Sequence, residues 1–163
     1  ALDGKGVTGR VHLADGWRIA GCPLNGPTIA SAHRRLAVSW FTAAYETPKV
    51  RIAYSSDSGA TFGPPIDVAT NTPIGQVSTV ALSDGSFLVG WLEFGGGQLA
   101  YQVRQVTEGG NLKESHTILR SATAIASAQL ACAAQRLYLS WATMSTNRVH
   151  LSHLSSELSP CAS

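Results

Sequence analysis

The sequence predicts an all-β protein made of repeated antiparallel units of four strands each. Tryptophan recurs about every 50 residues, at Trp40, Trp91 and Trp141. Each of these tryptophans ends an apolar stretch and follows a small residue, and a tight turn with another apolar stretch lies upstream. No segment of useful length shows the periodicity of an amphipathic helix. Short strands joined by turns are therefore expected throughout.

Each unit reads as strand, hairpin, strand, loop, strand, turn and strand. The clearest hairpin contains Asp84-Gly85, which is a strong turn signal between two apolar stretches. We expect the strands of the three units at 28–32, 36–40, 50–55 and 65–69; at 77–82, 87–91, 99–106 and 115–119; and at 124–132, 137–141 and 149–154. Residues 7–19 are expected to form the last one or two strands of a preceding unit.

Four-stranded units of about 40–50 residues are typical of β-propeller blades. A two-sheet sandwich is the competing architecture, but it does not predict a tryptophan that returns with each unit. We therefore expect residues 1–163 to form one partial β-propeller domain, equal to half of a six-bladed ring. Its parts would be a blade remnant at 1–21 and blades at 22–70, 71–120 and 121–163.

Three blades do not close a ring comfortably, and closure is what removes exposed sheet edges. Two arrangements would complete the ring. Either the missing blades belong to a longer chain, or two copies of this chain form a homodimer with six blades.

Charge and composition argue against several kinds of partner and cofactor. The net charge of +2 is too small to indicate nucleic acid or an anionic membrane as a partner. No stretch approaches the roughly 20 apolar residues of a membrane-spanning helix. The chain begins at Ala1 without a signal peptide, which fits a processed or truncated chain. His150 and His153 would point to opposite faces of a strand and could not readily bind one metal ion. No Gly-rich phosphate-binding loop is recognisable, so neither a metal nor another cofactor is expected.

The three cysteines lack the spacing of a zinc site. Cys132 lies in an apolar stretch and is most simply a buried small hydrophobic residue. Cys22 and Cys161 lie in loop-like surroundings. They would pair with each other or with cysteines outside this chain.

One turn carries a specific motif. Residues 55–62 read Ser-Ser-Asp-Ser-Gly-Ala-Thr-Phe and match the Asp-box pattern S/T-x-D-x-G-x-T-F/W at every defined position, with Ser55, Asp57, Gly59, Thr61 and Phe62 as the defining residues. The Asp57 carboxylate can accept hydrogen bonds from N–H groups of the turn and from the Thr61 hydroxyl. Gly59 can adopt the positive φ that the turn requires, and Phe62 can pack against the sheet. The carboxylates needed for calcium are missing, so we expect a structural role.

With this motif the chain resembles the sialidase-like (BNR/Asp-box repeat) β-propeller family. The segment 15–27, which leads into the Trp40 unit, is similar to the C-terminal half of secreted bacterial sialidase-like propeller proteins, and the resemblance covers about 11–154. It implies a secreted or periplasmic location in a bacterium. It also implies that the Asp-box turn faces away from the ligand-binding face, and that a partner of Cys22 lies in a segment absent here.

A sialidase needs several arginines for the substrate carboxylate, a tyrosine nucleophile activated by a glutamate, and an aspartate as acid/base. The Arg-Ile-Pro motif of the family is absent. The nearest strings are Arg18-Ile19-Ala20 and Arg51-Ile52-Ala53, and Arg51 falls in a third strand. We therefore expect a module that binds a glycan or a protein without a complete catalytic site. The alternative is an exo-sialidase-type glycoside hydrolase completed by a second chain or by missing blades.

The topology predicts where a ligand would bind. Loops between second and third strands and crossings between units should lie at the end opposite the Asp-box turn. The candidate residues there are Cys22, Asn25, Tyr45, Glu46, Gln76, Glu93 and Arg148. Tyr45-Glu46 is the one Tyr/Glu pair among them, and a solvated loop is the alternative interpretation of that pair.

Overall fold

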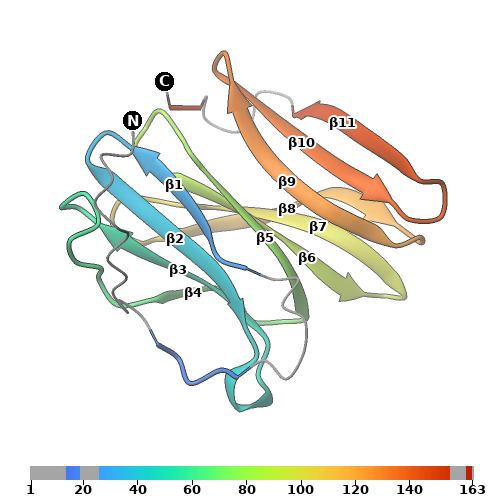
Figure 1. Ribbon diagram of the computed structural model, residues 1–163, viewed down its shortest axis with the longest axis horizontal. Coiled ribbons are helices and arrows are strands. Elements are labelled where there is room, and N and C mark those ends of the chain that lie inside the picture. Colours follow the sequence, from blue (N-terminus) through green and yellow to red (C-terminus); the bar gives the residue numbers. More distant parts are fainter. Residues whose placement is uncertain (1–13, 19–25, 155–160, 163) are drawn as a thin grey trace, which may run out of the picture.

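The computed structural model describes residues 14–18, 26–154 and 161–162. It is all-β, with three antiparallel sheets of four, four and three strands (Figure 1). The first sheet contains β1 (Thr28–Ala32), β2 (Arg35–Thr42), β3 (Lys49–Ser55) and β4 (Ile66–Ala69). The second contains β5 (Pro73–Ala81), β6 (Phe87–Gly95), β7 (Gln98–Val106) and β8 (Leu112–Ser121). The third contains β9 (Ile125–Ala133), β10 (Arg136–Thr143) and β11 (Arg148–Leu154).

The strands of each sheet follow one another in chain order. All the strands expected within 28–154 are present, with ends that differ from the expected ones by a few residues. Among the described residues, one short helical turn, η1 (Ala44–Glu46), lies between β2 and β3. None of the helices in the described part of the chain is long and apolar enough to cross a membrane.

The expectation of a strand at 7–19 is wrong for its described part. Residues 14–18 lie outside the strands. The Asp15 carboxylate accepts a hydrogen bond from the Trp17 N–H at 3.1 Å, and Gly16 has a φ of +79°, so this segment turns instead of extending. Residues 7–13 and 19 are outside the described residues.

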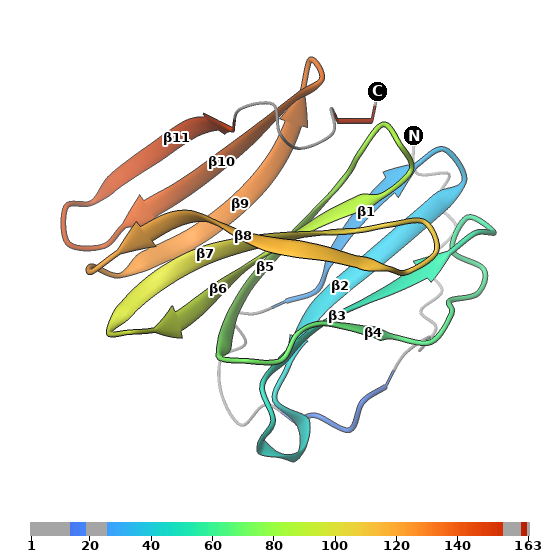
Figure 2. The ribbon, with the colours of Figure 1, turned by 180° about the vertical axis from the view of Figure 1, so that it is seen from behind.

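The three sheets stack face to face, with the β5–β8 sheet in the middle (Figure 2). One apolar core lies between the first and second sheets and includes Ile52, Phe87 and Trp91. A second core lies between the second and third sheets and includes Tyr101 and Leu139. The middle sheet is therefore covered on both faces at β5 to β7, and β6 is buried continuously from Phe87 to Leu92.

Polar side chains of β5 connect the middle sheet to both neighbours. The Thr79 hydroxyl donates a buried hydrogen bond of 2.8 Å to the Ser39 hydroxyl of β2. The Ser78 hydroxyl accepts a 2.8 Å hydrogen bond from the Leu130 N–H of β9. Because buried polar groups are costly unless paired, these bonds favour one alignment of the three sheets.

The three repeated tryptophans occupy matching positions in the strand register. Trp40 lies opposite Arg51, Trp91 opposite Gln102, and Trp141 opposite His150 on the following strand. Their surroundings differ, because Trp91 is buried in the middle sheet whereas Trp141 is half-buried and stacks on the His150 ring. The matching register supports a structural repeat.

The cysteine pairing differs from the expectation. Cys161 forms a disulfide with Cys132, so Cys132 is not a free buried thiol and Cys161 does not pair with Cys22. Cys161 forms an antiparallel bridge with Leu82 just beyond β5, and the next residue donates its N–H to the Ala81 carbonyl at 3.1 Å. This pairing places the Cys161 sulfur next to β9. Cys22 lies outside the described residues.

Candidate functional site

The turns of the first two sheets gather at two opposite ends. At one end, the Ser58 N–H of the β3–β4 turn donates to the Arg34 carbonyl of the β1–β2 hairpin. Arg35 of the same hairpin donates to the Gly85 carbonyl at 2.6 Å and forms an ion pair with Glu108 at 3.4 Å. These contacts bring the turns of two sheets together, and we call this the 55–62 end.

The turn at 55–62 is held by its own side chains. The Asp57 carboxylate accepts hydrogen bonds from the Thr61 hydroxyl at 2.6 Å and from the Thr61 N–H at 2.9 Å. The Ser55 hydroxyl donates to Asp57 at 2.7 Å and accepts from the Gly59 N–H at 2.7 Å. Gly59 has a φ of +90°, and Phe62 is half-buried. The hydrogen bonds expected of Asp57 and the expected φ of Gly59 are confirmed.

These hydrogen bonds make a pH-dependent contribution to stability. Donation by the Thr61 hydroxyl, then by the Thr61 N–H and the Ser55 hydroxyl, holds the pKa of Asp57 well below its usual range. A folded-state pKa below the unfolded one gives stability that is present above the unfolded pKa of about 3.9 and is lost as the pH falls toward the folded pKa.

We expect Asp57→Asn to lower the melting temperature at pH 7 and to do so less at pH 3, where the wild type has lost part of this contribution. Thermal melts at both values measure the difference. In carboxyl NMR titrations, Thr61→Val should raise the pKa of Asp57 because it removes one donor. An Asp57 pKa at the ordinary aspartate value in the wild type would contradict the prediction.

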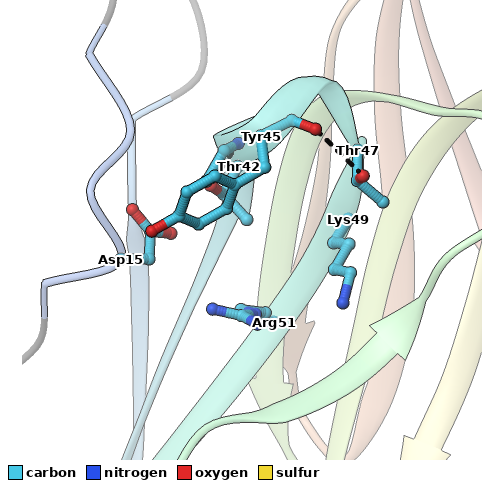
Figure 3. Close-up of a pocket in the computed structure, with 7 residues that line it drawn as sticks. Asp15, Thr42, Tyr45, Thr47, Lys49 and Arg51 are labelled. Carbon is cyan, nitrogen blue, oxygen red and sulfur yellow. Dashed lines mark hydrogen bonds between the residues drawn. The ribbon is translucent and has the colours of Figure 1, made fainter.

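A hollow lies at the opposite end of the first sheet from the 55–62 end, next to the β2–β3 loop (Figure 3). We call it the Tyr45 hollow. Its volume is about 130 Å3, and its lining residues are Asp15, Thr42, Ala44, Tyr45, Thr47, Lys49 and Arg51. The β2–β3 loop and the start of β3 supply most of these residues, and the turn at 14–18 supplies Asp15.

The β2–β3 loop holds Tyr45 in an unusual backbone conformation. Tyr45 and Glu46 have φ values of 56° and 57°, a region that few residues other than glycine adopt. The Thr42 hydroxyl accepts the Ala44 N–H at 3.2 Å, and the Thr47 hydroxyl donates to the Tyr45 carbonyl at 3.2 Å. The loop thereby holds the Tyr45 ring at the mouth of the hollow, 91% exposed to solvent.

The charged groups around the hollow nearly balance. Asp67 on β4 binds Lys49 at 2.7 Å and the Arg51 Nε at 2.8 Å. Burial would raise the pKa of Asp67, but the hydrogen bonds and charges of Lys49 and Arg51 outweigh it and lower the pKa. Both basic side chains of the hollow are therefore held by one carboxylate.

Asp15 contributes a second carboxylate. It accepts a hydrogen bond from the Trp40 indole N–H at 3.0 Å. Burial alone would raise its pKa, but hydrogen bonds from Trp40, Thr42 and the Trp17 N–H outweigh that effect. The charge of Arg51 lowers the pKa further, so Asp15 is an ionised acceptor at neutral pH.

The other candidate residues do not line this hollow. Gln76 is half-buried, and its side-chain amide bonds to the Ile125 carbonyl and the Ala128 N–H of β9. Glu93 accepts a hydrogen bond from the Trp91 indole at 3.2 Å. Arg148 is exposed at the start of β11, in the third sheet. Glu46 is exposed beside Tyr45, and Asn25 lies outside the described residues.

Sequence reasoning missed most of the hollow. Lys49 and Arg51 are two residues apart on β3, so their side chains lie on the same face of the sheet. This spacing is visible in the sequence. Asp15 gives no such signal, because its position depends on how the turn at 14–18 docks on Trp40.

Three arginine side chains, those of Arg35, Arg51 and Arg104, bind other groups of the protein. Arg35 is held at the 55–62 end, and Arg51 is bound to Asp67. Arg104 donates to the Val68 carbonyl at 2.6 Å and lies over the Trp91 ring. Within 14–18, 26–154 and 161–162, no group of three or more His, Cys, Asp or Glu residues is placed to hold a metal ion.

The arrangement at the Tyr45 hollow suits the binding of a small polar ligand. It joins one exposed aromatic ring to a carboxylate, hydroxyl groups and a guanidinium group within a shallow depression. Comparison with protein-family models and with curated proteins gives no match for this chain.

Proposed function

We propose that the chain is a sialidase-like β-propeller module that binds a glycan in the Tyr45 hollow and has no complete catalytic site of its own. The observation that carries the proposal is the strained loop that presents Tyr45. Two consecutive residues hold a sparsely populated backbone conformation while an aromatic ring stays 91% exposed. Strain of this kind concentrates at functional sites, and an exposed aromatic face is a good surface for a sugar ring.

The charge balance supports an uncharged sugar over a strongly acidic ligand. Asp67 already neutralises Lys49 and Arg51, and Asp15 adds a negative acceptor. Sugar hydroxyls can donate to Asp15 and accept from the terminal nitrogens of Arg51. A ligand carboxylate would have to compete with Asp67 for the basic groups.

The propeller arrangement and the secreted location have separate support. The stacked meander sheets, the repeated tryptophan register and the hydrogen-bonded turn at 55–62 support blades of the Asp-box type. The Cys132–Cys161 disulfide supports a secreted or periplasmic location, because disulfides persist in oxidising compartments.

Saturation-transfer NMR with a panel of neutral and sialylated oligosaccharides tests the binding. Tyr45→Ala should weaken binding of the best neutral sugar by about tenfold or more, the equivalent of about 1.4 kcal/mol. Phe94→Ala is the matched control, because Phe94 is an exposed aromatic outside the hollow, and it should leave binding unchanged. Equal binding by both variants, or no binding by the wild type, would refute the proposal.

The second candidate is an exo-sialidase-type hydrolase completed by another chain. It is favoured by one observation, namely that a tyrosine hydroxyl and an ionised carboxylate, those of Tyr45 and Asp15, share the hollow. A fluorogenic sialoside separates the two candidates. We expect no turnover by the purified chain, and turnover that is lost in Tyr45→Phe would establish the hydrolase instead.

A further inference from the structure

The third sheet exposes residues whose counterparts in the other two sheets are buried. The strand register makes this comparison possible, because Ser39 of β2 pairs with Ile52, Gly90 of β6 with Val103, and Ser140 of β10 with Leu151. These three positions precede the repeated tryptophans. Ile52 and Val103 are fully buried, whereas Leu151 is 71% exposed.

The next position along the same face shows the same difference in burial between the sheets. Phe41 pairs with Val50, Leu92 with Tyr101, and Ala142 with Val149. Val50 and Tyr101 are fully buried, and Val149 is 82% exposed. Val50 and Ile52 pack against the second sheet, and Tyr101 and Val103 pack against the third. By the same geometry, Val149 and Leu151 face the place of a fourth sheet.

The first sheet has the complementary face, on which the described turn at 14–18 contacts Trp40. Ile29 of β1 pairs with Val38, Thr79 of β5 with Val89, and Leu130 of β9 with Leu139. Thr79 faces the preceding sheet, where it bonds to Ser39, and Leu130 lies in the core shared with the preceding sheet. Ile29 holds the same position and is 62% exposed. It therefore faces the place of a sheet that would precede β1.

In the part of the chain that the structure describes, no further sheet covers either face. Exposed apolar side chains in this alternating pattern on one strand face are typical of a surface that packs against another sheet.

We propose that a second copy of this chain covers these faces. The Ile29 face of one copy packs on the Val149–Leu151 face of the other, and a twofold axis repeats the contact so that six sheets close a ring. Each contact between copies would then resemble the contacts inside one chain, where the first sheet packs on the second and the second sheet packs on the third. Closed twofold symmetry buries both open faces at once and does not lead to fibres. This inference rests on the stacking of the sheets and not on ligand binding. Lys49 and Arg51 alternate with the core residues Val50 and Ile52 and so share the Ile29 face, which means that the second copy would border the Tyr45 hollow.

Light scattering coupled to gel filtration tests the proposal on the full chain. The wild type should have twice the 17.1 kDa mass of one chain. Leu151→Glu and Ile29→Glu should each weaken association by about 100-fold or more, because each buries an unpaired charge. Leu112→Glu is the matched control on exposed β8 of the middle sheet and should remain dimeric. Circular dichroism confirms that each variant is folded.

Mixing the two disrupted variants distinguishes this dimer from one in which the third sheet packs on itself. The Leu151→Glu copy keeps an intact Ile29 face, and the Ile29→Glu copy keeps an intact Val149–Leu151 face. Their mixture should therefore form heterodimers through one intact contact. A wild type that stays at 17.1 kDa up to high concentration, a dimer that survives Ile29→Glu, or a mixture that remains monomeric would each overturn the proposal.

Discussion

Gly90→Ala is expected to destabilise the protein severely. A Cβ at Gly90 would lie 2.6 Å from the Tyr101 hydroxyl and 2.8–2.9 Å from two carbons of its ring. Tyr101 is fully buried between the second and third sheets, so its ring has no free space to move into. Overpacking of this kind costs about 1–3 kcal/mol or more, which thermal or urea unfolding would measure.

A second substitution isolates the cause. Tyr101→Val removes the ring, so the Gly90→Ala/Tyr101→Val pair should cost less than the sum of the two single changes. Tyr101→Phe removes the clashing hydroxyl but keeps the two clashing ring carbons, so it should relieve Gly90→Ala only in part. Ser140→Ala, at the matching position of the third sheet, adds no atoms and should therefore cost far less than Gly90→Ala. Additive costs for Gly90→Ala and Tyr101→Val would contradict this explanation.

Loss of the Cys132–Cys161 disulfide should also lower the stability of the protein strongly. The bond closes a loop over a sequence separation of 29 residues and holds the Cys161 segment against β5. A loop of this length corresponds to roughly 3–4 kcal/mol from restriction of the unfolded chain. Urea unfolding of the Cys132→Ala/Cys161→Ala variant should show a loss of this size.

Reduction provides the control for the disulfide. A thiol reductant should lower the stability of the wild type to nearly that of the double variant and should leave the double variant unchanged. Equal stabilities of the oxidised and the reduced wild type would show that the disulfide contributes nothing to stability and would contradict the prediction.

The strands could be predicted from the sequence because their signals are local. The apolar stretch that ends at Trp91 and the Asp84-Gly85 turn before it define a hairpin without reference to the rest of the chain. The hydrogen bonds of Asp57 were likewise predictable, since all their partners lie within 55–62. Repetition of one local pattern then predicted three sheets in chain order.

The disulfide and the Tyr45 hollow could not be predicted in the same way. Cys161 reaches Cys132 only because its segment pairs with Leu82, which is remote in sequence from both. Gln76 looked like a binding residue in a crossing segment, but it bonds to β9, a contact set by the stacking of two sheets. Tyr45 is the predicted ligand-binding residue that lines the hollow. Its position could be predicted because it depends on the β2–β3 loop alone.

Amide chemical-shift mapping tests most directly whether the Tyr45 hollow binds a glycan. The wild-type chain would be titrated with the best neutral oligosaccharide of the panel. We expect saturable shifts at Asp15 and across 42–51, with the turn at 55–62 unchanged. Shifts centred on 55–62, or no saturable shifts at Asp15 and 42–51, would contradict a glycan site at the Tyr45 hollow.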